Sequence, residues 1–316
     1  MSVGVSRAQS SRALGIALGH LADRRFGDPR RGHPVAIFGS AAAALERRTY
    51  ADSRARGLLH LALLAGTAAG GGLGLELRTR HHPVAHTLVT AAATWTVLGG
   101  TSLAREARTV HDLLAADDLP DARQRLTHLV GRDTSVLDEA EVSRAVVESV
   151  AENTSDAVVA PLVWGALLGV PGLLGYRAAN TLDAMVGHRG ERYGRFGWAS
   201  ARFDDLLNLP GARLSGLLAA ALAPTVGGHP SAALQAWRRD AHRHPSPNAG
   251  VVEAAFAGAL GVRLGGRNHY AHGTEDRVVL GHGPPPDRAD IERAVRLADA
   301  VGTGAVVVAV LVALRR

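Results

Sequence analysis

Long apolar runs alternate with strongly polar segments along this chain. A helix that crosses a membrane needs about 20 mainly apolar residues, and Gly57–Leu77 and Pro83–Ala104 both satisfy this requirement. The connector between them, RTRHH at 78–82, is short and basic. These two runs therefore predict a hairpin of membrane helices.

Three further apolar runs are shorter or interrupted. Ala157–Gly175 is apolar throughout, but Pro161 and Pro171 are expected to bend or end a helix there, because proline cannot donate a backbone hydrogen bond. Ala212–Gly227 and Val301–Leu314 are shorter candidates. Together with the first two runs, they favour a membrane protein.

The fold class follows from these runs. A soluble helical protein is the alternative, but Val306–Leu314 (VVVAVLVAL) has no polar face to present to water. We predict an all-α polytopic integral membrane protein with about four or five transmembrane helices. The chain is expected to fold as a single domain over residues 1–316.

The polar segments predict additional helices outside the bilayer. Arg105–Val130 is interpreted as a pair of amphipathic helices with Asp117–Asp121 between them. Asp138–Glu152 predicts a further helix, and Gly281–Asp287 (GHGPPPD) is interpreted as a linker before the C-terminal helical region. These helices and loops are where polar chemistry is expected.

Four carboxylates share one face of the helix that begins near Asp138. Glu141, Glu148, Glu152 and Asp156 follow one another at spacings of 7, 4 and 4 residues, which places them on the same side of an α-helix. Like charges at such spacing repel unless solvent, arginine or a cation balances them. The series therefore indicates either a site or a solvated helix face.

Composition excludes several function classes. The net charge is +6, but the arginines are scattered and lack the basic stripe with interleaved aromatics that is typical of nucleic-acid binding. The absence of cysteine excludes a disulfide framework, a thiolate metal site and a cysteine nucleophile. No lysine is present to complete a Walker A motif, so any direct binding of ATP would be unconventional.

Five separated motifs occur in a defined order. They are FGDPRRGHPV (26–35), GRDTS (131–135), ESVAENTSDAVVAP (148–161), NTLDAMVGHRGERYGRFGWASARFDDLLN (180–208) and HPSPNAG (244–250). In this order the motifs resemble the CobD/CbiB family of cobalamin biosynthesis, and the resemblance covers about residues 14–283.

The resemblance implies a membrane enzyme, adenosylcobinamide-phosphate synthase. Such an enzyme joins adenosylcobyric acid to aminopropanol or its phosphate through an amide bond, with ATP as the driving nucleotide and Mg²⁺ beside it. The resemblance also implies a place in the cell membrane, an active site on the cytoplasmic side and possible contact with other membrane enzymes of cobalamin synthesis. The chemistry needs activation of the carboxylate and a base for the protonated amine, and the motifs contain arginine, carboxylates and histidine.

Acidic residues of the motifs are assigned to catalysis and metal binding. Three are predicted to be catalytic: Glu148, Glu152 and Asp183. Because Mg²⁺ prefers hard oxygen ligands and is often held by one or two carboxylates, Glu152 and Asp156 are the first candidate ligands. Asp204 and Asp205 are the second. Helix capping and ion pairing with nearby arginines are the alternative roles.

Other polar residues of the motifs are predicted to bind nucleotide or corrinoid. They are Arg132, Asp133, Asn153, Asn180, Arg192, Asp204, Asp205, His244, Ser246 and Asn248. The planar guanidinium of arginine suits phosphate and carboxylate oxygens, although arginine at a surface is the commoner case. Asn180 and Asp183 share one helix face and are expected to line the site, and helix packing is the alternative role for Asn180.

Two short segments have alternative interpretations. His244, Ser246 and Asn248 either form a polar lid, with Glu253 on the helix that follows, or belong to a structured loop in which Asn248 caps that helix. In the first motif, Asp28 and His33 either bind substrate or form a rigid turn in which Asp28 caps the helix beginning near Pro34.

Two non-enzymatic functions remain as alternatives. A membrane-embedded sensor would keep the polar pocket for a corrinoid ligand without turnover, and a transporter would also place charge within the membrane. No inverted repeat supports the transporter. Arginine-rich loops indicate that Arg105–Asn153 and Arg177–Asn208 face the cytoplasm.

Overall fold

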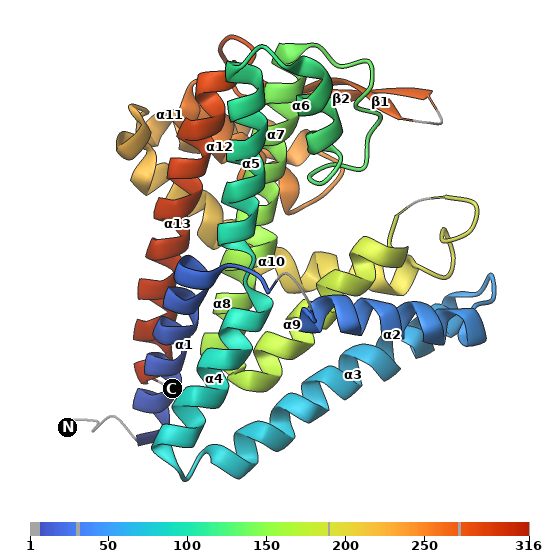
Figure 1. Ribbon diagram of the computed structural model, residues 1–316, viewed down its shortest axis with the longest axis vertical. Coiled ribbons are helices and arrows are strands. Elements are labelled where there is room, and N and C mark those ends of the chain that lie inside the picture. The colour runs from blue at the N-terminus through green and yellow to red at the C-terminus, as the bar shows by residue number, and fades with distance from the viewer. Residues whose placement is uncertain (1–6, 30–31, 189, 271–272, 316) are drawn as a thin grey trace. The chain divides into compact units, whose positions relative to one another are not determined.

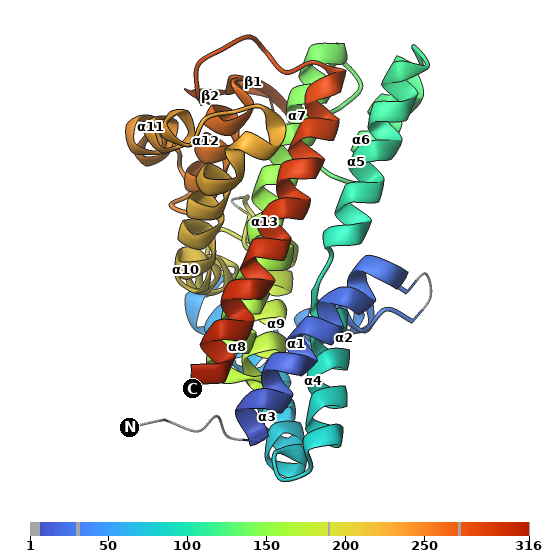
Figure 2. The same cartoon turned by 90° about the vertical axis from the view of Figure 1, so that its left-hand side faces the viewer.

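Helices make up nearly all of the fold in the computed structural model, which describes residues 7–29, 32–188, 190–270 and 273–315 (Figures 1 and 2). The prediction of an all-α membrane protein is confirmed. The elements are α1 (Arg7–Phe26), α2 (Pro34–Thr49), α3 (Arg54–Thr79), α4 (Pro83–Val97), α5 (Gly100–Ala115), α6 (Leu119–Leu126), α7 (Glu139–Thr154), the π-helical segment η1 (Ser155–Val159), α8 (Ala160–Leu168), α9 (Val170–Val186), α10 (Trp198–Leu222), the 3₁₀ turn η2 (Ala223–Val226), α11 (Pro230–Asp240), the 3₁₀ turn η3 (Ala241–Arg243), α12 (Ala249–Leu260), β1 (Leu264–Tyr270), β2 (Gly273–Leu280) and α13 (Arg288–Arg315).

The chain forms two compact units, and each unit is assembled from separate stretches of sequence. Unit 1 comprises the described residues of Met1–Gly99, Ala160–Pro210 and Val306–Arg316. Unit 2 comprises Gly100–Val159 and Gly211–Ala305. Two of the boundaries between these stretches of sequence fall within α10 and α13. The single-domain prediction is not tested by this division.

Three helices are long and apolar enough to cross a membrane among the described residues. They are α3, the continuous stretch Trp198–Val226 formed by α10 and η2, and α13. The predicted runs Gly57–Leu77, Ala212–Gly227 and Val301–Leu314 correspond to these three helices.

The two other predicted runs are interrupted. Pro83–Ala104 is divided between α4 and α5, because Leu98 adopts an extended conformation with ψ of 154°. Ala157–Gly175 is divided where α8 ends and Gly169 takes a φ of 71°. Pro171 lies in the first turn of α9, where a missing N–H costs little. Its predicted role in ending the preceding helix agrees with this break.

In unit 1, small residues allow α1 and α4 to pack closely. A Cβ atom added at Gly15 would lie 2.5 Å from Cβ of Thr90, and one added at Gly19 would lie 2.4 Å from Cβ of Thr94. Two glycines four residues apart therefore form a flat strip against two threonines with the same spacing. This small-residue contact is typical of helices that associate in a membrane.

A buried carboxylate connects several helices of unit 1. Glu76 on α3 accepts hydrogen bonds from Arg12 of α1 at 2.8 Å and from the first backbone N–H of α9, that of Val170, at 3.0 Å. His86 of α4 lies 3.0 Å from the same carboxylate. Because both carboxylate oxygens have partners, the charge is stabilised inside the helical unit.

In unit 2, the predicted polar helices are present. The pair α5 and α6 corresponds to the predicted amphipathic helices. The helix α7 begins with a capping box, in which the Asp138 side chain accepts from the Glu141 backbone N–H and the Glu141 side chain accepts from the Asp138 N–H. The cap explains why this helix starts where the sequence predicts.

A two-stranded hairpin in unit 2 was not predicted. The antiparallel strands β1 and β2 pair from Leu264 opposite Leu280 to Tyr270 opposite Gly273, with a bulge between Leu264 and Gly266 (Figure 1). Gly265 within the bulge has a φ of +80°, and a Cβ there would lie 2.0 Å from the carbonyl oxygen of Val278. Only glycine fits this position.

Candidate functional site

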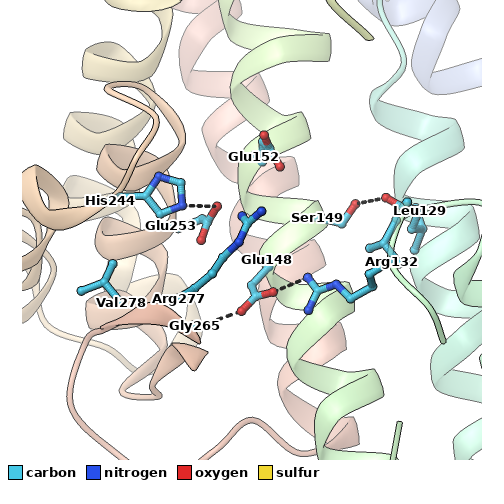
Figure 3. A pocket seen from close by; sticks show the side chains of 12 residues that line it. Leu129, Arg132, Glu148, Ser149, Glu152, His244, Glu253, Gly265, Arg277 and Val278 are labelled. Atoms are coloured by element: carbon cyan, nitrogen blue, oxygen red, sulfur yellow. Dashed lines mark hydrogen bonds and ion pairs between the residues drawn. The ribbon is translucent and has the colours of Figure 1, made fainter. Parts of the chain in front are cut away.

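Unit 2 contains a polar cavity of about 300 Å³ (Figure 3). Its lining comes from α7, α12, the hairpin and the loops after α6 and η3, and consists of Leu129, Val130, Gly131, Arg132, Glu148, Ser149, Glu152, His244, Glu253, Gly265, Arg277 and Val278. Four residues that the sequence analysis selected separately, in three different motifs, are thus brought together: Arg132, Glu148, Glu152 and His244.

Both carboxylate oxygens of Glu148 accept hydrogen bonds from neighbouring residues. Its Oε2 atom accepts a hydrogen bond from Arg132 at 2.5 Å, and its Oε1 atom accepts one from the backbone N–H of Gly265 at 2.8 Å. The side chains of Arg132 and Glu148 are each only 9% exposed. On the same helix, Arg144 donates to the carbonyl oxygens of Gly265 and Arg267. Glu148 and Arg144 therefore attach the hairpin to α7.

Glu152 lies one turn further along α7 and opens to the cavity. Its side chain is exposed to the cavity space, and the loss of hydration inside the cavity raises its pKa. The positive charge of Arg277 opposes this rise, whereas the negative charge of Glu148 adds to it. Glu152 is therefore a carboxylate that takes up a proton more readily than one in water.

His244 and Glu253 face each other across a short gap in the cavity wall (Figure 3). Nε2 of His244 lies 3.9 Å from Oε1 of Glu253, and the two side chains are 4% and 8% exposed. Burial lowers the pKa of His244, and burial together with the charges of Glu148 and Glu152 raises the pKa of Glu253 well above its usual value. Both groups are accordingly stabilised in their neutral forms.

Arg277 is the cavity residue that the sequence analysis missed. It lies on β2, and its side chain extends toward α7 between Glu253 and Glu148 (Figure 3). It lies outside the five motifs on which the family resemblance rests. The available signal was the apolar run Val278–Leu280 followed by Gly281, which is typical of a strand that ends in a turn.

Three predicted residues near the cavity do not line it. Asp133 accepts from both the N–H and the hydroxyl of Ser135, so it stabilises a local turn. Asn153 donates to the carbonyl and hydroxyl oxygens of Ser149 on its own helix. Asp156 begins the π-helical segment η1 and is absent from the cavity lining.

The HPSPNAG segment is folded differently from the predicted cap. Asn248 occupies the N-cap position of α12, but its side chain makes no capping bond and accepts instead from Arg213 at 2.7 Å. Ser246 stabilises the start of the helix, because its hydroxyl accepts from the backbone N–H groups of Asn248 and Ala249. Among these three residues, only His244 reaches the cavity.

Unit 1 contains a second polar network. Asp204 on α10 is buried and accepts from Asn180 at 3.3 Å and from Asn208 at 2.8 Å. Tyr176 donates to Asn208 at 2.6 Å. The predicted proximity of Asn180 and Asp204 is therefore observed within this unit, and the contacts fit the helix-packing role for Asn180.

The remaining predicted residues of unit 1 have mainly structural partners. The guanidinium of Arg192 pairs with Glu46 at 2.9 Å and lies over the ring of Tyr50. Asp205 lies 3.7 Å from Arg202 on the same helix. Asp183, on α9, is half-buried. The contact between Asp205 and Arg202 matches the ion-pairing alternative for Asp205.

In the first motif, the helix cap is His33 and not Asp28. Nδ1 of His33 accepts from the backbone N–H of Val35 at the start of α2. Asp28 lies 3.4 Å from Nε2 of the same histidine. Within the described part of the motif, Asp28 thus orients the residue that caps the helix.

No group of three or more His, Asp or Glu side chains that could hold a metal ion is found among the described residues. The predicted Glu152–Asp156 pair is not assembled in the cavity, because Asp156 does not contribute to its lining. A two-carboxylate Mg²⁺ site at this pair therefore does not fit the cavity geometry.

Comparisons with known proteins place the chain in one family. The family model described as CobD/Cbib protein matches residues 16–298. The protein named Cobalamin biosynthesis protein CobD from Mycobacterium tuberculosis is 55% identical over 307 residues, which is 97% of each chain. Proteins of the same name from Geobacter metallireducens and Chromobacterium violaceum are 49% and 45% identical, and cover 79% and 90% of this chain and 80% and 91% of their own length. No solved structure matches the chain. The protein described here belongs to the CobD/CbiB family.

Proposed function

We propose that this protein acts in cobalamin biosynthesis and forms an amide bond between a corrinoid propionate and the amine of aminopropanol or its phosphate. The family match and the name shared by the related proteins support the pathway. The observation that supports amide chemistry is the cavity of unit 2, where carboxyl groups, two guanidinium groups and a neutral imidazole share a space of about 300 Å³.

The size of the cavity limits what enters it. Pockets of roughly 300 to 1,000 Å³ hold drug-sized ligands, so this cavity is at the lower end of that range. It suits a small amino alcohol together with the end of a propionate arm. We expect the macrocycle of adenosylcobyric acid to stay outside it.

Different cavity residues are assigned to different steps of amide formation. The amine enters protonated, and Glu152 accepts that proton so that the nitrogen lone pair becomes nucleophilic. The raised pKa of Glu152 favours this transfer. Arg277 offers its positive charge to the carboxylate or phosphate oxygens of the substrates. Glu148 holds the hairpin that carries Arg277, because both oxygens of Glu148 are already engaged.

ATP and Mg²⁺ are part of this proposal through the family resemblance. When bound, ATP with Mg²⁺ would supply the phosphoryl group that makes the carboxylate oxygen a leaving group. Asp183, Asn180 and Asp204 of unit 1 are retained as proposed site residues.

The reaction is tested with purified, detergent-solubilised protein. Adenosylcobyric acid, aminopropanol or its phosphate, and Mg²⁺ are supplied with and without ATP, and the corrinoid product is identified by mass. We expect an ATP-dependent product that Glu152→Gln abolishes. The matched control Glu139→Gln changes an exposed carboxylate at the start of the same helix and is expected to remain active.

Absence of product with every amine would contradict the enzyme proposal if the folded protein still binds the corrinoid. That result would favour the sensor or the transporter. Movement of labelled corrinoid into sealed vesicles containing the protein would then distinguish the transporter from the sensor.

We also propose that the site faces the cytoplasm in the cell membrane. The natural chain has no cysteine, so single cysteines introduced at Asp118 and Gly190 provide a clean labelling test. Neither is expected to react with an impermeant thiol reagent applied to intact cells. Labelling of either position from outside would contradict this orientation.

A further inference from the structure

One buried nitrogen in the cavity wall has no hydrogen-bond partner in the part of the chain that the structure describes. It is Nε2 of His244, in a side chain that is only 4% exposed. The nearest acceptor given by the structure, Oε1 of Glu253, is 3.9 Å away, which is too long for a hydrogen bond. A buried polar group left unsatisfied is destabilising, so a partner from outside the chain is expected.

The contacts of Nδ1, the other ring nitrogen of His244, indicate which of the two nitrogens carries the proton of the neutral ring. Nδ1 of His244 accepts the backbone N–H of Ser246 at 3.1 Å, the shorter of its two contacts with that residue. Because burial favours the neutral ring, a single proton is present, and this contact places it on Nε2. His244 therefore offers a donor directed at the gap beside Glu253.

The width of the gap selects the kind of partner. An oxygen atom about 2.8 Å from both Nε2 and Oε1 fits between them at an angle of about 90°. A hydroxyl would accept from His244 and donate to the Glu253 carboxyl group. A phosphate ester oxygen would accept from His244 and from Glu253 in its neutral form. A methyl group would satisfy neither residue.

We propose that His244 and Glu253 form the subsite for the alcohol oxygen of the amine substrate and thereby select an amino alcohol over a simple alkylamine. This inference rests on the proposed function, because it assigns the amine to the same cavity. The shared chemistry is one oxygen atom, which is either a free hydroxyl or the ester oxygen of a phosphate.

Local structure places both residues where this role requires them. His244 precedes α12, and Glu253 lies in the first part of that helix. A Cβ added at Gly250 would lie 2.5 Å from Cβ of His244, so glycine at this position allows the imidazole to pack on the helix that carries its partner. The gap is therefore defined by one short segment of backbone.

The test compares kcat/KM for aminopropanol, aminopropanol phosphate and propylamine. We expect the wild type to prefer an oxygen-containing amine by roughly 10²-fold or more, because an analogue without the oxygen leaves buried polar groups unpaired. His244→Asn keeps an acceptor for the Ser246 N–H but removes the donor at Nε2. It is expected to lower kcat/KM for the preferred amine by about 10²-fold and to change that for propylamine by less than about threefold.

His244→Gln provides the matched rescue, since its side-chain amide places a donor near the position of Nε2. It is expected to restore selectivity to within about tenfold of the wild type. His229→Asn serves as a control, because Nδ1 of His229 likewise accepts a backbone N–H two residues further along, that of Ser231, but His229 lies outside the cavity. Equal losses for propylamine and for the oxygen-containing amines in His244→Asn would overturn the subsite.

Binding measured without ATP separates this inference from the proposed reaction. Calorimetric titration is expected to show tighter binding of the oxygen-containing amine than of propylamine, and His244→Asn is expected to remove the difference. Preserved binding selectivity without product would support the subsite while the reaction fails. If His244→Asn weakens binding of the phosphorylated amine alone, the oxygen at the subsite is the ester oxygen. If it weakens binding of aminopropanol alone, that oxygen is the free hydroxyl. Unchanged selectivity in His244→Asn would refute the inference.

Discussion

Oε1 of Glu148 accepts a hydrogen bond from the backbone N–H of Gly265 at 2.8 Å, and this bond joins α7 to the bulge at the base of the hairpin. The opposite oxygen of Glu148 is bound by Arg132. The carboxylate thus links a helix, a loop and a strand, and the strand that pairs with β1 carries Arg277 into the cavity.

Replacing Glu148 by Gln is expected to destabilise unit 2 and loosen the hairpin. The substitution breaks the buried ion pair between Arg132 and Glu148, and breaking such a pair costs about 3–5 kcal/mol in other proteins. Chemical unfolding in detergent measures the stability, and hydrogen exchange at β1 and β2 measures the loosening. Glu139→Gln on the same helix is the control, and equal exchange in the two variants would contradict the linking role of Glu148.

The raised pKa of Glu253 predicts that its contribution to the free energy of unfolding falls as pH rises. Because its folded-state pKa is raised, the folded protein holds a proton that the unfolded chain releases above about pH 4.3. The free energy of unfolding of the wild type should therefore fall relative to that of Glu253→Gln as pH rises from about 5 to 7. Unfolding curves at several pH values measure the difference. A constant difference would argue against a raised pKa.

The lowered pKa of Asp240 predicts that its contribution to the free energy of unfolding falls as pH decreases. Burial alone would raise its pKa, but hydrogen bonds from Arg239 and from the backbone N–H of Gly281 lower it. Its contribution to stability should be complete above about pH 4 and lost as pH falls further. Asp240→Asn is expected to cost about 1–3 kcal/mol at pH 7. The loss should shrink in unfolding experiments at pH 3, and a loss that is independent of pH would exclude this explanation.

Substitution of Glu152 and substitution of Asp156 are expected to differ in their effect on kcat, and neither is expected to raise the Mg²⁺ requirement much. If Glu152 accepts the proton of the amine, Glu152→Gln lowers kcat by roughly 10²-fold or more and leaves the half-saturating Mg²⁺ concentration within about twofold. Asp156→Asn is expected to change both quantities little, because Asp156 does not line the cavity. Titration of activity with Mg²⁺ provides the measurement. A large increase in the Mg²⁺ requirement of both variants would restore the two-carboxylate metal site.

Much of the fold could be predicted because its signals are local. Asp138 and Glu141 form the capping box that their spacing implies, and the apolar run at 57–77 became the membrane-length helix α3. The break at Gly169, just before Pro171, also agrees with the chemistry of that proline, which is favoured in the first turn of a helix. Such features depend on neighbours a few positions away.

Asp156 does not reach the cavity with Glu148 and Glu152, because the helix changes its period. The regular spacing from Glu148 to Asp156 assumes 3.6 residues per turn, but η1 at Ser155–Val159 is a π-helix with a wider turn. The side chains beyond Thr154 are therefore rotated relative to those of α7. Nothing in the residue types of this segment distinguishes a π-helix from an α-helix.

The cavity itself required tertiary information. Glu253 was expected as a companion of His244, but Arg277 lies on a hairpin whose glycine-rich and charged sequence lacks a clear alternation of apolar residues. Only the pairing of β1 with β2, and the attachment of β1 to α7 through Gly265, brings Arg277 to Glu152 and Glu148.

The division of the chain into interleaved units has a consequence for its synthesis. The last stretch of unit 1 begins at Val306, so everything before this residue must be synthesised before the unit has all its parts. Unit 2 likewise lacks part of its sequence until Ala305 has been synthesised. Neither unit can therefore be completed before the last helix has been synthesised, and the early helices must persist as incomplete assemblies until then.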